Sequence, residues 1–157
     1  MKVFSHNLSS TNSSCKKLNA FPHNVHHHSG VLDKDNKPFI CGGYISGDRL
    51  DSCYIYKNKT WSKTSSLPSK RSVAAMMSMK TSHGHKIFSS GGYDRNGGTD
   101  NFDTFTEGHW YNESKMSIRL YGHCMLQYNT STIIIIGGDS VSGRSNQTFF
   151  YNIQTKE

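Results

Sequence analysis

The sequence contains no apolar run long enough to cross a membrane as a helix. The four isoleucines at 133–136 fall far short of the ~18 consecutive apolar residues that such a helix requires. Residues 1–24 are rich in Ser and Asn and contain no apolar h-region, so a signal peptide is not expected there. No membrane partner is predicted.

Apolar residues are scarce overall. They make up 34% of the 157 residues, against the usual share of about 45–50%, a figure that also counts glycine. The apolar residues are grouped in short segments, and Ser, Thr, Asn and Gly fill the gaps between them. This pattern is typical of one domain built from many short strands joined by turns.

Clusters of basic charge are also absent. The net charge is +7, but Lys16-Lys17 and Lys70-Arg71 are the only adjacent basic pairs. Nucleic-acid-binding proteins usually gather Lys and Arg on one face, often among stacking aromatic residues. We therefore interpret the charge as a solvated basic surface and predict no nucleic-acid partner.

Motifs for catalysis or metal binding are missing too. The sequence has no C-x-x-C, G-x-S-x-G, P-loop or H-E-x-x-H motif. The run His26-His27-His28 would place only His26 and His28 on the same face of a strand, which is half a metal site at most. We interpret these residues as strand and loop histidines, and we expect no enzyme activity and no cofactor.

A double glycine recurs three times, at steps of 49 and 46 residues, each time behind a short apolar segment. The thirteenth residue after each pair is aromatic, and the eighteenth is tryptophan in the first two repeats. The residues are Gly42-Gly43 with Tyr56 and Trp61, Gly91-Gly92 with Phe105 and Trp110, and Gly137-Gly138 with Tyr151. A period near fifty indicates one supersecondary unit used repeatedly.

Each repeat is predicted to form four strands, a to d, after a weakly ordered lead at residues 1–20. The repeats span about 21–66, 67–115 and 116–157. The expected strands are 26–32, 38–41, 53–56 and 60–63, then 72–79, 86–89, 100–105 and 109–111, then 120–128, 132–136 and 148–152. The glycines allow positive φ and close backbone approach, and the large aromatic residues fill the wedge between neighbouring sheets.

This arrangement resembles the kelch repeat, on the glycine pairs, the spaced aromatic residues and the linker arginines Arg71 and Arg119. The other common propeller repeat, WD40, has a shorter period and a Trp-Asp signature that this chain lacks. The resemblance implies an all-β, partial kelch β-propeller with about three four-stranded antiparallel blades, the last incomplete. Closed propellers have about four to eight blades. We therefore expect a fragment, an incomplete gene product or part of an assembly.

The resemblance also implies a function, which is to bind a partner protein through the loops between strands b and c and between d and a. Candidate contact residues are Arg71, Arg119, Asp94 and Arg95. The alternative for both linker arginines is a structural hydrogen bond to loop carbonyls.

A second hypothesis is a secreted kelch propeller that binds carbohydrate or resembles galactose oxidase. The oxidase centre would need Tyr, His and Cys ligands to copper. Tyr44, Tyr93 and Tyr121 are available, but nothing identifies them as ligands.

Cys41 and Cys53 are predicted to end strand b and to begin strand c of the first repeat. Antiparallel pairing could place them opposite each other, either as a disulfide or as two buried thiols. Six N-x-S/T sequons occur, at Asn7, Asn12, Asn58, Asn112, Asn129 and Asn146. Together with a disulfide, these would favour an extracellular parent over a cytoplasmic one.

Overall fold

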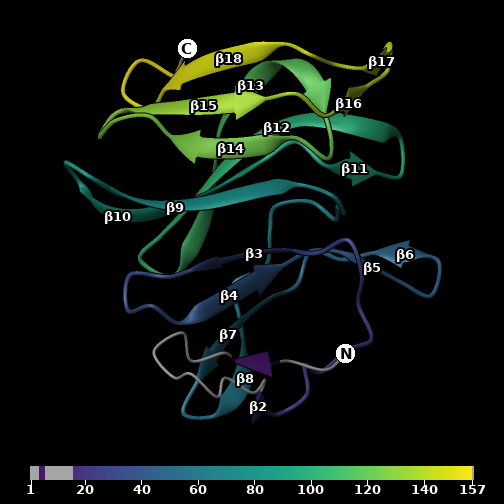
Figure 1. Ribbon diagram of the computed structural model, residues 1–157, viewed down its shortest axis with the longest axis vertical. Helices are drawn as coiled ribbons and strands as arrows, with labels where there is room; N and C mark the ends of the chain where they lie inside the picture. Colours follow the sequence, from purple (N-terminus) through teal and green to yellow (C-terminus); the bar gives the residue numbers. More distant parts are fainter. Residues whose placement is uncertain (1–3, 6–15, 157) are drawn as a thin grey trace, which may run out of the picture.

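The computed structural model describes Phe4–Ser5 and residues 16–156, and antiparallel sheets make up this part of the chain (Figure 1). Three sheets follow one another along the sequence, and we call them units 1, 2 and 3. Unit 1 has the order β3 (Ser29–Leu32), β4 (Pro38–Cys41), β7 (Cys53–Lys57), β8 (Thr60–Thr64). Unit 2 has the order β9 (Ala75–Thr81), β10 (Gly84–Ser90), β12 (Gly97–Thr106), β13 (His109–Leu120), and unit 3 has the order β14 (Cys124–Gln127), β15 (Thr132–Ile136), β18 (Thr148–Asn152).

The all-β prediction is thereby confirmed, and the sheets are compatible with a propeller-like arrangement. Among the residues that the structure describes, no helix is long and apolar enough to span a membrane. Two further short strands, β1 (Phe4–Ser5) and β2 (Lys16–Lys17), pair within the predicted lead. The rest of that prediction, at residues 1–3 and 6–15, lies outside the described residues.

Short hairpins extend all three units at the same end, on the right of Figure 1. In unit 1, β5 (Tyr44–Ile45) pairs with β6 (Asp48–Arg49). In unit 2, β11 (Tyr93–Asp94) pairs with the start of β12, and in unit 3, β16 (Asp139–Ser140) pairs with β17 (Gly143–Arg144). We call this end of the molecule, which carries the hairpins and the linkers between units, the loop face.

The glycine pairs let the backbone of one unit approach the next. The amide of Gly43 donates to the carbonyl of Arg71 at 3.0 Å, and that of Gly92 donates to the carbonyl of Leu120 at 2.8 Å. All six glycines have φ between 55° and 109°, a region that other residues rarely adopt. A Cβ on Gly91 would lie 2.2 Å from the Leu120 oxygen. At Gly42 and Gly91, the first glycines of their pairs, the residue type is therefore set by the contact between units as well as by φ.

Apolar side chains fill the two interfaces between the units. Buried residues of unit 1 pack against unit 2 in one cluster, with Phe39, Cys41 and Cys53 on one side and Ile87 on the other. A second cluster joins units 2 and 3 and includes Met77, Met79, Phe88, Phe102, Ile133, Ile135 and Tyr151. The shortest ring contact in this cluster is between Tyr151 and Phe102, whose centroids are 4.1 Å apart.

The tryptophans lie where the repeat predicted large aromatic residues. Trp110 packs into the cluster between units 1 and 2, with its centroid 5.3 Å from Phe105 and 6.4 Å from Phe39. Trp61 is half-buried and packs 4.9 Å from Phe21 and 5.1 Å from Tyr56. Trp110 therefore fills the wedge between two sheets as expected, while Trp61 packs on the segment that precedes unit 1.

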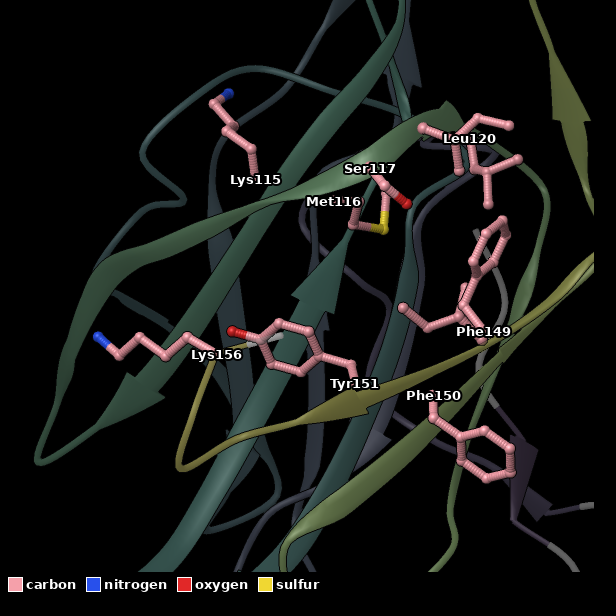
Figure 2. A pocket seen from close by; sticks show the side chains of 10 residues that line it. Lys115, Met116, Ser117, Leu120, Phe149, Phe150, Tyr151 and Lys156 are labelled. Atoms are coloured by element: carbon pink, nitrogen blue, oxygen red, sulfur yellow. The ribbon is translucent and has the colours of Figure 1, made fainter.

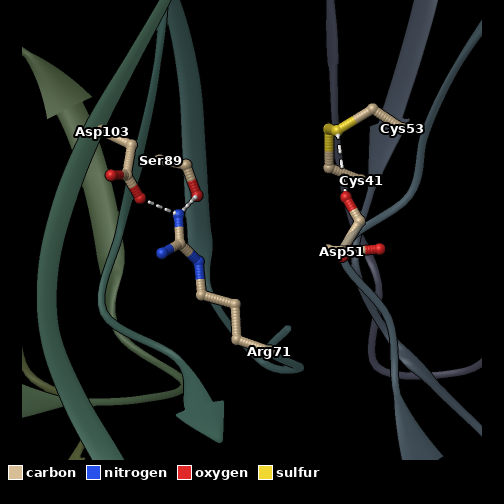
Figure 3. Close-up of a disulfide and its surroundings, with 6 residues drawn as sticks. All are labelled: Cys41, Asp51, Cys53, Arg71, Ser89 and Asp103. Atoms are coloured by element: carbon tan, nitrogen blue, oxygen red, sulfur yellow. Dashed lines mark hydrogen bonds and ion pairs between the residues drawn. A yellow bond between two sulfur atoms is a disulfide. The ribbon is translucent and has the colours of Figure 1, made fainter. Parts of the chain in front are cut away.

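Of the two alternatives for Cys41 and Cys53, the structure has the disulfide. Cys41 of β4 and Cys53 of β7 are opposite each other in the ladder, and a disulfide joins them (Figure 3). Cys124 is a free, exposed thiol. A disulfide is compatible with an extracellular protein.

Strand a begins later than predicted in all three units, including unit 3, where it was expected from Leu120 and β14 begins at Cys124, because the chain breaks the ladder near the loop face. We expected strand a of the first two repeats to begin at His26 and Ser72, but β3 begins at Ser29 and β9 at Ala75. His26 and Ser72 instead form isolated bridges with Tyr44 and Tyr93. The next residues, His27 and Val73, both have φ of 55°, which interrupts an extended strand.

Candidate interaction surface

Arg49 lies between two tyrosines on the loop face. Its guanidinium carbon is 5.6 Å from the ring centroid of Tyr44 and 4.8 Å from that of Tyr93. Tyr44 belongs to unit 1 and Tyr93 to unit 2, and each directly follows the glycine pair of its unit. A guanidinium this close to an aromatic face gains cation–π stabilisation. The contact therefore spans the boundary between two units.

The row of rings continues in both directions. His26 lies 5.3 Å from Tyr44 between ring centroids, and Tyr121 of the linker into unit 3 makes an edge contact with Tyr93 at 5.0 Å. We call His26, Tyr44, Arg49, Tyr93 and Tyr121 the aromatic row. With His27, Ser72 and Val73, these residues line a shallow cavity of about 270 Å³. His26 is exposed and the other four members are half-buried, so a bound molecule could reach them.

A wider hollow with charged walls lies beside the row. It has a volume of about 610 Å³, and its lining includes Asp48, Lys70, Asp94 and Arg95. Lys70 donates to Asp48 at 2.7 Å, and both side chains are more than half exposed. This hydrogen bond lowers the pKa of Asp48 and raises that of Lys70, while the charge of Arg95 further lowers the pKa of Asp48. Asp48 is therefore negatively charged and Lys70 positively charged at neutral pH.

Arg119 is exposed and borders a third hollow on the same face, of about 160 Å³. Asp94, Asp100 and Lys115 also line it. Lys115 donates to Asp100 at 2.9 Å, and this contact lowers the pKa of that carboxyl. Three of the four residues predicted to contact a partner, Asp94, Arg95 and Arg119, therefore lie together on the loop face.

Arg71 does not belong to this surface, and the prediction that it contacts a partner is wrong. Its side chain is fully buried. Figure 3 shows it pointing inward from the linker, where it pairs with Asp103 and donates to Ser89 at 3.0 Å. Asn112 donates to the other oxygen of Asp103 at 3.1 Å. The structural alternative therefore holds for Arg71, with side-chain acceptors rather than loop carbonyls.

The two linker arginines are also not equivalent positions. The carbonyl of Arg71 accepts from Gly43, and in the next linker the carbonyl of Leu120 accepts from Gly92. Arg71 therefore corresponds to Leu120, and Arg119 corresponds to Lys70. The two linker arginines are therefore one position apart in the register of the repeat.

The sequence did not single out the aromatic row as a binding surface. The signal that could have identified it is a tyrosine directly after two of the three glycine pairs, at Tyr44 and Tyr93. Within the described part of the chain, no group of three or more His, Cys, Asp or Glu side chains is placed to hold a metal ion.

A further cavity of about 220 Å³ lies between β13 and β18 (Figure 2). Mainly apolar residues line it, including Met116, Leu120 and Phe149. It belongs to the contact between units 2 and 3. At its edge, Lys156 pairs with Glu113 at 2.8 Å.

Comparison with known proteins supports the fold alone. No family model matches the chain, and no curated protein matches its sequence. The solved structure of YjhT superposes with a TM-score of 0.84 at 13% sequence identity. The match covers 99% of this chain and 57% of the YjhT chain. The chain therefore spans less than two thirds of that structure, and they share an architecture.

Proposed function

We propose that the three units are blades of a partial kelch β-propeller and that the protein is a non-catalytic module that binds another protein through its loop face. The near-fifty-residue repeat, the four-stranded order of units 1 and 2, and the glycine contacts between units support the kelch assignment. The observation that carries the function is Arg49 held between Tyr44 and Tyr93 across a unit boundary.

The composition of this surface suits a protein partner. Tyr and Arg are the residues that most often dominate binding energy at protein interfaces, because they bury large areas and still form directed polar contacts. The aromatic row offers ring faces, and the exposed side chains of Arg95 and Arg119 lie beside it on the loop face. The chain has a net charge of +7. We therefore propose a partner segment with carboxylate side chains, which this charge would attract.

Peptides selected from a random display library on the immobilised protein test this proposal. Arg49→Ala and Tyr93→Ala should each weaken binding of the selected peptides at least about tenfold, as expected for hot-spot residues. Lys37→Ala is the matched control, because Lys37 is an exposed, ion-paired residue in the turn between β3 and β4, at the opposite end of unit 1 (Figure 1). Equal binding by all variants, or failure to select any peptide, would contradict the proposal.

We also propose an extracellular setting, supported by the Cys41–Cys53 disulfide. Non-reducing mass analysis of the natural protein, before and after glycosidase treatment, tests it. A mass two hydrogens below that of the reduced chain, with glycan on Asn58, supports secretion. Asn58 is exposed in the turn between β7 and β8. Fully reduced cysteines in the natural protein would contradict it.

A further inference from the structure

The side of unit 3 that faces away from unit 2 is an exposed apolar surface. Leu126 of β14, Ile136 of β15 and Phe150 of β18 are 56%, 38% and 60% exposed. Strand pairing puts Leu126 opposite Ile134, and Ile134 opposite Phe150, so these side chains form a row across the sheet. Figure 2 shows Phe149 and Phe150 pointing to opposite sides of β18. We call this surface the unit 3 end face.

The same positions are covered in the two preceding units, fully in unit 2 and in part in unit 1, where Phe39 is buried and Val31 and Ile55 are half-buried. By strand pairing and distance from the glycine pair, the row Leu126, Ile134 and Phe150 corresponds to Met77, Phe88 and Thr104 in unit 2 and to Val31, Phe39 and Ile55 in unit 1. Met77, Phe88 and Thr104 are only 7%, 2% and 1% exposed. Unit 3 covers them, as unit 2 covers the row in unit 1. The unit 3 end face therefore repeats a docking surface that occurs twice within the chain.

The backbone supports the same conclusion. A Cβ on Gly42 would lie 2.6 Å from the Arg71 oxygen of the next linker, and one on Gly91 would lie 2.2 Å from the Leu120 oxygen. At the equivalent Gly137, the closest atom is the oxygen of Ser145, at 3.5 Å and within unit 3 itself. The position that receives the linker of a following unit is thus open at unit 3.

The complementary surface is on unit 1, on the side away from unit 2. Leu32 is 51% exposed there. Its neighbour Pro38 is half-buried, whereas Ile87, the equivalent residue in unit 2, is 2% exposed. Phe21 covers the outer part of this side, at Trp61, and leaves Leu32 open. We call this surface the unit 1 end face.

We propose that two copies of this chain associate head to tail as a closed pair, with the unit 3 end face of each on the unit 1 end face of the other. Each junction would repeat the packing that already joins unit 1 to unit 2 and unit 2 to unit 3. Two arcs of three units give a ring of six, within the range of about four to eight found in closed propellers. The closed ring rests on the propeller proposed above, whereas the junction between two copies rests only on the observed contacts between units.

Sedimentation velocity over a range of concentrations tests the pair. The wild-type protein should sediment as a dimer. Phe150→Glu and Leu32→Glu should each lower the dimer fraction at least about tenfold, because each would bury a carboxylate in an apolar contact. Tyr111→Glu is the matched control, since Tyr111 is 49% exposed on β13 of unit 2 and lies on neither end face. Circular dichroism checks that each variant folds, and Phe150→Ser and Leu32→Ser replace any that does not.

Mixing the two monomeric variants tests the polarity of the junction. Phe150→Glu keeps an intact unit 1 end face and Leu32→Glu keeps an intact unit 3 end face, so an equimolar mixture should regain dimers. A wild-type monomer at all concentrations would overturn the proposal. Loss of dimer in Phe150→Glu alone would indicate contact between two unit 3 faces, and open-ended growth would indicate a filament; either result overturns the closed pair. Peptide binding at the loop face should be measured on the monomeric variants as well. This measurement tests the proposed function independently of whether the pair forms.

Discussion

The buried pair of Arg71 and Asp103 occupies positions that the next interface fills with apolar residues. The set Arg71, Ser89 and Asp103 corresponds to Leu120, Ile135 and Phe149 at the next interface, where all three are apolar. Arg71 and Asp103 are both fully buried. Burying two charges costs desolvation energy, and apolar residues of suitable size can replace such a pair without loss of stability. The interface between units 2 and 3 therefore shows that apolar residues can pack at the positions that the ion pair occupies.

Asp103→Ala should lower the free energy of unfolding by about 3–5 kcal/mol, because it leaves the Arg71 charge buried without its carboxylate. The triple variant Arg71→Leu, Ser89→Ile, Asp103→Phe should recover most of that loss. Urea unfolding followed by circular dichroism measures both. Asp35→Ala, in the exposed pair with Lys37, serves as the control and should change stability little. A triple variant less stable than Asp103→Ala would show that the ion pair itself is required.

His123 lies in the interface between units 2 and 3 and is only 6% exposed. Its Nε2 is 2.7 Å from the hydroxyl of Ser90, and its Nδ1 has no partner among the described residues. Burial lowers the pKa of His123 to about 4. The equivalent position in unit 2 holds Ala74, so the fold also accepts a small apolar residue there.

The lowered pKa of His123 predicts a loss of stability in mild acid. Its unfolded pKa is about 6.5, so between about pH 6.5 and 4 the unfolded chain binds a proton that the folded chain does not. The free energy of unfolding therefore falls as the pH falls through this window, by about 2 kcal/mol from pH 7 to pH 5. His123→Ala should remove this part of the pH dependence, measured by urea unfolding at both pH values. An unchanged difference would contradict the assignment.

The contacts of some of these residues could be predicted from the sequence, and those of others could not. The Cys41–Cys53 pairing was accessible, because two antiparallel strands joined by a short loop place particular residues opposite each other. The burial of Arg71 was not, because its acceptors Ser89 and Asp103 lie 18 and 32 residues away. Sequence spacing shows that an arginine opens a repeat, but only the packed interface shows which way it points.

At the scale of elements, the central strands were the most predictable. β4 and β15 have the bounds that the apolar runs and the following glycines predicted. β13 was predicted to span 109–111 but continues to Leu120, because it keeps pairing with β12 across register shifts. The two-residue strands on the loop face have no periodicity to detect. They pair as short hairpins, and the residue after each glycine pair also bridges to the segment that leads into its unit.

The candidate surface was only partly predicted, because some of its contacts depend on how neighbouring units pack. The loops were expected to meet at one face, and Asp94, Arg95 and Arg119 do so. The contact of Arg49 with Tyr93 joins residues 44 positions apart in different units. Its existence depends on the angle between two sheets, which the repeat period does not specify.

The molecule as a whole is a stack in which the units differ in how much of their surface is covered. Unit 2 packs on both faces, against unit 1 through Ile87 and against unit 3 through Phe88. Unit 3 packs on one face, and the edge of β18 opposite β15 pairs with no strand in the described ranges. In repeat proteins, stability is close to a sum of unit and interface contributions. Unit 2 should therefore be the most stable part of the chain.

Native-state hydrogen exchange followed by mass spectrometry tests this order. Amides of β10 should exchange more slowly than those of β15, although both are central strands, because opening unit 2 breaks two interfaces and opening unit 3 breaks one. The comparison requires the monomeric Phe150→Glu variant, in which no second copy protects the unit 3 end face. In the wild-type protein at high concentration, β15 should gain protection, since the proposed pair supplies its missing interface. Equal exchange of β10 and β15 in the monomer would mean that the three units open as one cooperative body, and the additive description of the stack would be wrong.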